Sequence, residues 1–156
     1  MTFDFADWRV QVDVDATRRH TTDNASDHCD CAYCRNFYET LPLSYPGLCA
    51  ALSRLGINPM GPSELMPFSP ELYLACYRVK GRILRWGRSR LAVGDIPIVL
   101  EAGEEGSFFL WAGEMVLPWV QPEPAAEVMS PANMPEFLER MRLTWLLRHG
   151  QEQIPS

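Results

Sequence analysis

Long apolar runs are absent from this sequence. No stretch of about 18 consecutive apolar residues exists, so no transmembrane helix is expected. Residues 1–10 carry acidic side chains where a secretory signal peptide is basic, which is untypical of an exported protein. The sequence therefore predicts a soluble, cytoplasmic protein without a membrane partner.

Basic residues are scarce relative to acidic ones. The 156 residues include 14 Lys and Arg against 20 Asp and Glu, which gives a formal net charge of −6. A field of this sign repels phosphate backbones, so a nucleic-acid partner is not expected unless a local basic patch overrides it. With 47% hydrophobic and 22% charged residues the composition is typical of a globular protein, and we expect residues 1–156 to form a single domain.

The motifs of several common enzyme classes are missing as well. The chain has no G-x-S-x-G elbow, no Walker loop, no dinucleotide-binding glycine motif and no H-E-x-x-H. Only three histidines are present, His20, His28 and His149, so candidates for a general base are few. These absences favour a non-enzymatic binding or structural protein.

The N-terminal part shows one strand pattern. Residues 9–15 alternate between apolar and polar side chains, which predicts a half-buried strand. Residues 16–27 are mostly polar and have no period, so we expect a loop there. Residues 58–70 contain four prolines, which lack a backbone donor and predict a second connecting loop.

Two short helices are predicted between these loops. The apolar side chains from Cys31 to Leu41 fall near helical spacing, with Asp30 as the expected N-cap and Pro42 as the expected end. A second helix is expected over residues 44–56, because its leucines share one face and a glycine ends it.

Residues 71–120 show strand patterns separated by turn residues. We expect a strand over 71–85, a turn over 86–89, a return strand over 90–100, a turn over 101–106 and a strand over 107–120 that is broken near Gly113. Strands that follow one another through short turns predict an antiparallel meander whose first two strands form a hairpin.

A longer helix is predicted near the C-terminus, after a proline-rich link over 118–135. Asn133 and Glu136 have the spacing of a capping box. The apolar residues that recur at helical spacing are Met134, Phe137, Leu138, Met141 and Trp145. The apolar stripe is wide enough to need cover from the sheet or from a partner, which leaves a homo-oligomer open. The fold class is therefore α+β: an antiparallel sheet packed by two short helices and a longer C-terminal helix.

Three of the five cysteines lie within seven residues. The segment 28–34 reads His-Cys-Asp-Cys-Ala-Tyr-Cys, so Cys29, Cys31 and Cys34 span a loop and the first turn of a predicted helix. Thiolates this close in sequence can bind zinc tetrahedrally, which makes the cluster a candidate zinc site. The candidates for the fourth ligand are His28, His20 and Cys49.

Two other interpretations of these cysteines stay open. Free cysteine is often buried as a small apolar residue, and Cys31 and Cys34 share a predicted helix face with Tyr38 and Leu41. Alternatively, Cys31 attacks and Cys34 resolves in a thiol redox reaction, because a helix N-terminus lowers the pKa of a thiol. No predicted strand leads directly into this helix, as a thioredoxin-like motif would require.

Several motifs between Cys29 and Glu123 together resemble a known family. They are Cys29-x-Cys31-x-Tyr-Cys34-x-Asn36-Phe37, Leu-Gly-Ile at 55–57, Pro62-x-Glu64-Leu65 and Leu117-Pro118-Trp119-Val120. This combination resembles a family of small uncharacterised proteins of Gram-positive gut bacteria. The resemblance implies a bacterial protein, and it implies no activity, substrate or ligand.

One segment has a local excess of positive charge. Six basic residues and no acidic residue lie from Arg78 to Arg90. Arg78, Lys80 and Arg82 share a strand face, and with Trp86 at the turn this basic hairpin could bind single-stranded nucleic acid. Pairing with acidic side chains across strands is the simpler explanation, and the net negative charge favours it.

Overall fold

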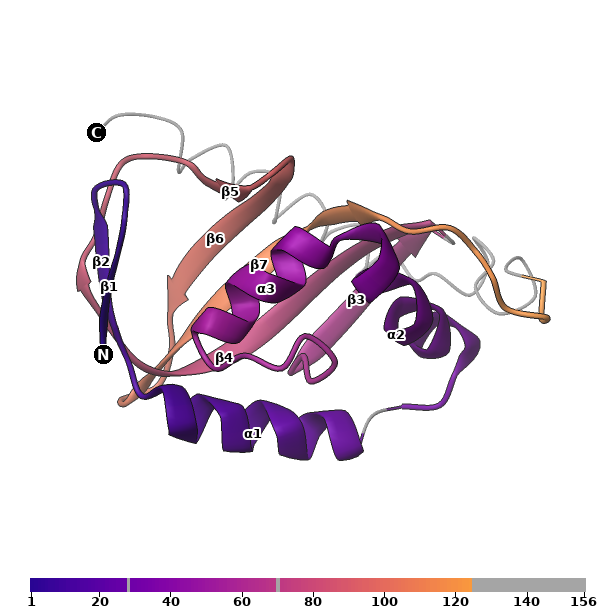
Figure 1. Cartoon of the computed structure of the whole chain (residues 1–156), viewed down its shortest axis with the longest axis horizontal. Helices are drawn as coiled ribbons and strands as arrows, with labels where there is room; N and C mark the ends of the chain where they lie inside the picture. The colour runs from indigo at the N-terminus through magenta and orange to yellow at the C-terminus, as the bar shows by residue number, and fades with distance from the viewer. Residues whose placement is uncertain (28, 70, 125–156) are drawn as a thin grey trace.

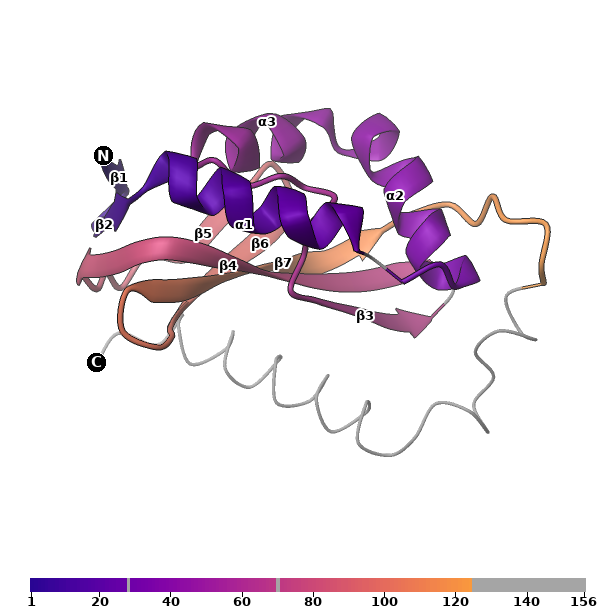
Figure 2. The ribbon, with the colours of Figure 1, turned by 90° about the horizontal axis from the view of Figure 1, so that it is seen from below.

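The computed structural model describes residues 1–27, 29–69 and 71–124. They form one seven-stranded antiparallel sheet and three helices (Figure 1), which confirms the predicted α+β class. All three helices lie on the same face of the sheet (Figure 2). The helices are α1 (Val14–Ser26), α2 (Ala32–Ser44) and α3 (Pro46–Arg54). The strands are β1 (Thr2–Phe5), β2 (Trp8–Val12), β3 (Glu64–Ser69), β4 (Leu72–Arg85), β5 (Leu91–Val93), β6 (Ile96–Ala102) and β7 (Ser107–Val116).

The long strand β4 organises the sheet. The strand order is β1-β2-β4-β7-β6-β5, and β3 pairs with β4 outside this path. Because β7 occupies one edge of β4, β2 and β3 share the other edge, where they pair with its second and first halves. The pairing with β2 begins at Gly81, whose φ is 148° and where a Cβ would lie 1.9 Å from the carbonyl oxygen of Gln11. A residue without a side chain is therefore needed where β2 approaches β4.

The main core lies between this sheet and the helices. The residues of β4 from Tyr73 to Tyr77 are all buried, and Leu74 belongs to a second cluster with Met66 and Val99, so this part of the strand is covered on both faces. Alternate side chains of β4 belong to the main core. These side chains are Tyr73, Ala75, Tyr77 and Val79. Phe37 and Leu41 of α2 and Leu48 and Leu52 of α3 belong to the same cluster. The core therefore fixes α2, whose N-terminal end carries the cysteines.

The prediction of a loop over 16–27 is wrong, because these residues belong to α1. Asp13 caps this helix by accepting a hydrogen bond from the backbone N–H of Ala16 at 3.0 Å. The buried side chains of α1 are Thr17 and Thr21 rather than apolar residues. Thr17 Oγ1 accepts from the backbone N–H of Lys80 at 3.0 Å, so the helix docks on β4 through a polar side chain.

The two predicted short helices are confirmed, with different ends. Cys31 rather than Asp30 is the N-cap of α2, because its sulfur accepts a hydrogen bond from the N–H of Cys34. Pro42 lies inside α2 and does not end it. The last turn closes beyond the proline, where the N–H of Tyr45 donates to the carbonyl oxygen of Leu41 at 2.9 Å.

The proline-rich segment 58–70 is only partly a loop, since β3 begins at Glu64. Among the described residues β3 pairs with β4 alone, and a proline, which has no N–H to donate, is tolerated on such an edge strand, as Pro67 is here.

The predicted hairpin between 71–85 and 90–100 is also wrong. β5 pairs with β6 and not with β4, so only β5, β6 and β7 form a meander. The connecting residues fold instead over the turn between β1 and β2. Asp7 in this turn accepts hydrogen bonds from the backbone N–H groups of Arg88 at 2.7 Å and Ser89 at 3.1 Å. The indole N–H of Trp8 donates to the carbonyl oxygen of Ser89 at 2.9 Å.

The contacts of Asp7 predict a pH-dependent stability. Hydrogen bonds, first of all from the N–H of Arg88, lower the pKa of Asp7 from its ordinary value of 3.8 to about 2. Since the folded-state pKa is the lower one, the stabilisation is complete above about pH 4 and is lost as the pH falls toward 2. We therefore expect Asp7→Asn to lower the melting temperature at pH 7, with a difference from wild type that shrinks below pH 4. Asp95→Asn, in the exposed β5–β6 turn, is the control, and a pH-independent difference for Asp7→Asn would contradict the assignment.

Two further expectations concern membranes and the C-terminus. Within the part of the chain that the structure describes, no helix has the length and apolar character needed to cross a membrane. The predicted C-terminal helix, with Met134 to Trp145 and the Asn133 capping box, lies outside the described residues.

Candidate metal site

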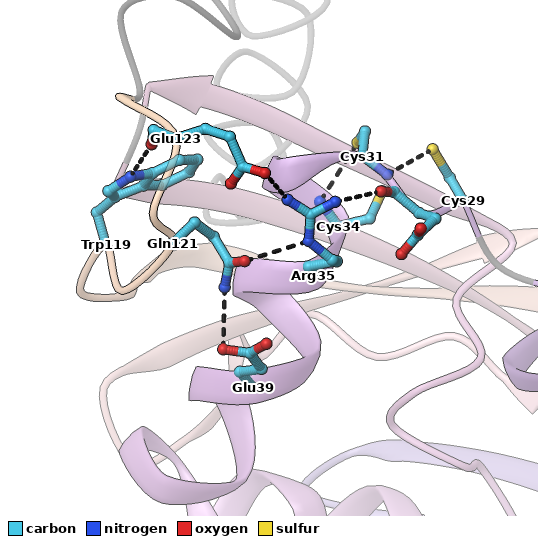
Figure 3. Close-up of polar contacts among 9 residues, drawn as sticks. Cys29, Cys31, Cys34, Arg35, Glu39, Trp119, Gln121 and Glu123 are labelled. Atoms are coloured by element: carbon cyan, nitrogen blue, oxygen red, sulfur yellow. Dashed lines mark hydrogen bonds and ion pairs between the residues drawn. The ribbon is translucent and has the colours of Figure 1, made fainter.

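Cys29, Cys31 and Cys34 form one cluster of sulfur atoms at the start of α2. Their Sγ atoms all lie within 4.8 Å of one another. Cys31 is the helix N-cap, Cys34 lies in the first turn, and Cys29 precedes the cap by two residues. This is the loop-to-helix position that the sequence predicted, and Figure 3 shows the three side chains gathered there.

Backbone hydrogen bonds hold two of the sulfurs in place. The N–H of Cys31 donates to Sγ of Cys29, and the N–H of Cys34 donates to Sγ of Cys31, both at 3.4 Å. The bond from the Cys31 backbone lowers the pKa of the Cys29 thiol. Burial raises the pKa of the Cys34 thiol, and the neighbouring sulfur of Cys31 raises it further. The cluster thus contains one thiol whose pKa is lowered by hydrogen bonds and one whose pKa is raised by burial and by the neighbouring sulfurs.

The interpretation as ordinary buried thiols does not fit this cluster. Cys29 and Cys31 are exposed and Cys34 is half-buried. By contrast Cys76, on β4, is buried, and burial raises the pKa of its thiol. Two of the three clustered sulfurs are therefore accessible to an ion or a reagent from solution.

The described candidates for a fourth ligand are not part of the cluster. Neither His20 nor Cys49 belongs to the group of close ligand atoms among the described residues. His20 lies on α1, with Nε2 at 3.4 Å from Nδ2 of Asn24, and burial lowers its pKa. Cys49 is half-buried on α3. His28 lies outside the described residues, so its role as a ligand stays a prediction.

Arg35 holds residues 29–31, the cysteine loop, in place through hydrogen bonds (Figure 3). Its Nη1 donates to the carbonyl oxygen of Asp30 at 2.6 Å, which fixes the residue between Cys29 and Cys31. On the other side, its Nη2 pairs with the carboxylate of Glu123 and its Nε donates to Oε1 of Gln121 at 3.2 Å. The hydrogen bond with Glu123 raises the pKa of Arg35, and the charge of Cys31 adds to this effect. One guanidinium thus joins the cysteine loop to a segment far along the chain.

Residues 117–123 pack along α2 and complete the surroundings of the site. The buried Asn36 accepts from the N–H of Val120 at 2.8 Å and donates to the carbonyl oxygen of Pro118 at 2.9 Å. The rings of Tyr33 and Trp119 meet edge to face, with centroids 5.1 Å apart. Both motifs are visible in the sequence, but their contact is not, because nothing in the spacing of two distant motifs indicates that they pair.

Three of the six basic side chains in the segment from Arg78 to Arg90 contact other groups of the protein. The guanidinium of Arg78 lies 5.3 Å from the centre of the Phe109 ring and 3.7 Å from the carboxylate of Glu104. Nε of Arg82 donates to Gln11 at 3.1 Å, and Nε of Arg85 donates to the carbonyl oxygen of Asp7 at 3.0 Å. These contacts support the structural interpretation of the charge, and a nucleic-acid partner stays an untested expectation.

Comparison of the chain with models of protein families, with curated proteins and with solved structures gave no match. The resemblance to small proteins of gut bacteria therefore stays a prediction.

Proposed function

We propose that this protein binds a zinc ion through Cys29, Cys31 and Cys34. The observation that carries the proposal is the approach of the three Sγ atoms to within 4.8 Å of one another. Around a tetrahedral zinc ion with bonds of about 2.3 Å, thiolate sulfurs lie about 3.8 Å apart. Rotations of exposed side chains are sufficient to close the difference.

The electrostatics of the cluster support a cation. A divalent ion removes the repulsion between the thiolates, so Cys34 can release its proton when the metal binds. The three cysteines leave one coordination position, which we assign to His28 or to a ligand from solution. A metal there would fix the link between α1 and α2 to the start of α2, which is a structural or binding role rather than catalysis.

The test is metal analysis of the untagged protein purified under reducing conditions. We expect close to one zinc per chain, and a loss of at least tenfold in zinc affinity for Cys34→Ser in competition with a chromogenic chelator. Cys49→Ser is the matched control, because Cys49 is half-buried but outside the cluster. His28→Ala tests the predicted fourth ligand, and cobalt substitution should give the absorption of a thiolate-bound tetrahedral ion. A protein that contains no zinc and takes none up from the competing chelator would refute the proposal.

A thiol redox function is the second candidate, favoured by the place of Cys31 as the cap of α2. The thiolate of Cys31 would attack a small disulfide such as oxidised glutathione and release one thiolate. Cys34 would then displace the second thiolate and leave a Cys31–Cys34 disulfide, so the chain loses two electrons and the small disulfide gains them. Rapid formation of this disulfide in a metal-free protein, measured by mass spectrometry after alkylation, would favour this function over zinc binding.

A further inference from the structure

A cavity of about 590 Å³ lies at the end of the molecule away from the cysteine cluster, near β1 and β5 in Figure 1. β1 and β5 are the two ends of the strand order, so the sheet curves until both outer strands line one cavity. Helix α3 and side chains of β6 and β7 form the other walls. The apolar side chains that line it include Phe3, Phe5, Leu52, Leu55, Leu91 and Val93.

The acidic and the basic side chain at this cavity differ in whether they already have an ion-pair partner. Among the described residues, two charged side chains line it, Asp4 and Arg54. Asp4 is already paired with Arg9, whose Nε lies 2.7 Å from Oδ1, and the hydrogen bond with Arg9 lowers the pKa of Asp4. Arg54, exposed at the end of α3, is in no ion pair with any of the described residues. An apolar molecule with an anionic group would therefore meet an available guanidinium, whereas a cation would meet a carboxylate that is already neutralised.

We infer that this cavity binds a small amphiphile of the fatty-acid class, with its chain among the apolar walls and its carboxylate at Arg54. The volume lies within the range of about 300–1,000 Å³ that is typical of small-molecule sites. The inference goes beyond the zinc site, because none of the lining residues belongs to the cysteine cluster.

Titration calorimetry of the full chain with octanoate, decanoate and dodecanoate, each below its micelle concentration, tests the inference. We expect saturable binding of one molecule per chain. The affinity should rise about three- to fourfold for each added methylene group until the cavity is filled, because each buried methylene adds a similar hydrophobic free energy. Dodecyltrimethylammonium, which has the same chain and the opposite charge, should bind more weakly than dodecanoate.

Neighbouring alanines of α3 provide a matched pair of variants. Ala51 lines the cavity, whereas Ala50 is exposed and does not. We expect Ala51→Trp to fill the cavity and reduce dodecanoate affinity at least tenfold, and Ala50→Trp to leave it unchanged. Arg54→Gln should reduce dodecanoate affinity up to about fivefold and should not weaken binding of the cationic amphiphile, while Arg19→Gln on α1 should have no effect. Circular dichroism checks that each variant is folded.

Three results would overturn the inference. The first is the absence of saturable binding of any of the carboxylates to the wild-type chain. The second is equal affinity for dodecanoate and dodecyltrimethylammonium. The third is an equal loss of affinity in Ala50→Trp and Ala51→Trp. If Ala51→Trp does not fold, the chain-length series and Arg54→Gln still decide the question.

Discussion

Gly61→Ala is expected to lower the free energy of unfolding by about 3 kcal/mol. A Cβ at residue 61 would lie 1.8 Å from the carbonyl oxygen of Thr21 and 2.7 Å from its carbonyl carbon. Both atoms belong to the backbone of α1, so no side-chain rotation relieves the clash. The helix and the segment after α3 must therefore separate. The separation would break the hydrogen bond of 2.8 Å from the N–H of Asn58 to Oγ1 of Thr21.

Gly47→Ala is the matched control for this prediction. Gly47 lies in the first turn of α3, and a Cβ there would meet no atom within 4 Å. Since alanine favours a helix over glycine, this variant should gain up to about 1 kcal/mol. Urea unfolding followed by circular dichroism measures both variants against wild type. Equal midpoints for Gly61→Ala and wild type would show that α1 does not pack against residue 61 in this way.

The same contact explains why the sequence did not predict α1. A search for amphipathic helices depends on apolar side chains at helical spacing, and the buried positions of α1 are Thr17 and Thr21. Their hydroxyl groups replace apolar contacts: Thr21 Oγ1 donates to the carbonyl oxygen of Thr17 at 2.9 Å and accepts from Asn58. One usable signal was present, since Asp13 before a run without proline or glycine is a helix N-cap.

The positions of β2 and β4 along the sequence were predicted better than their pairing partners in the sheet. The alternation in β2 and the β-branched and aromatic content of β4 are local properties. β4 covers nearly all of the predicted 71–85, whereas the strand predicted over 9–15 ends at Val12, because Asp13 caps α1 and residues 14–15 belong to that helix. Which strands pair depends on side chains far apart in sequence, as for Leu72 opposite Val116. A short turn after β4 favoured the next strand as partner. That expectation failed because Asp7 and Trp8 bind the turn residues instead.

The same difference between contacts local in sequence and contacts between distant residues applies to the cysteine cluster and its surroundings. Cys29, Cys31 and Cys34 are two and three residues apart, so local chain geometry alone brings their sulfur atoms together. Arg35 and Glu123 are 88 positions apart, and only the packing of residues 117–123 along α2 joins them. The candidate ligands could therefore be predicted from the sequence, while the residues that hold them in place could not.

Asn36→Ala is expected to cost about 3 kcal/mol of unfolding free energy, because Asn36 is fully buried and joins α2 to this distant segment. The variant would leave the N–H of Val120, the carbonyl oxygen of Pro118 and the hydroxyl of Tyr73 without their shared partner. A buried polar group that loses its partner costs about 1–3 kcal/mol, and some of these groups can regain water.

Thr40→Val, one turn further along α2, separates this effect from the loss of any buried polar group. Thr40 is also buried, but its hydroxyl donates only within the helix, to the carbonyl oxygen of Asn36 at 2.7 Å. Valine has nearly the same shape, so we expect a loss of about 1 kcal/mol or less. Urea unfolding of both variants gives the comparison. Equal losses would mean that the contact between α2 and residues 117–123 adds nothing to stability, whereas the expected difference makes Asn36 the residue that holds this segment beside the cysteine loop.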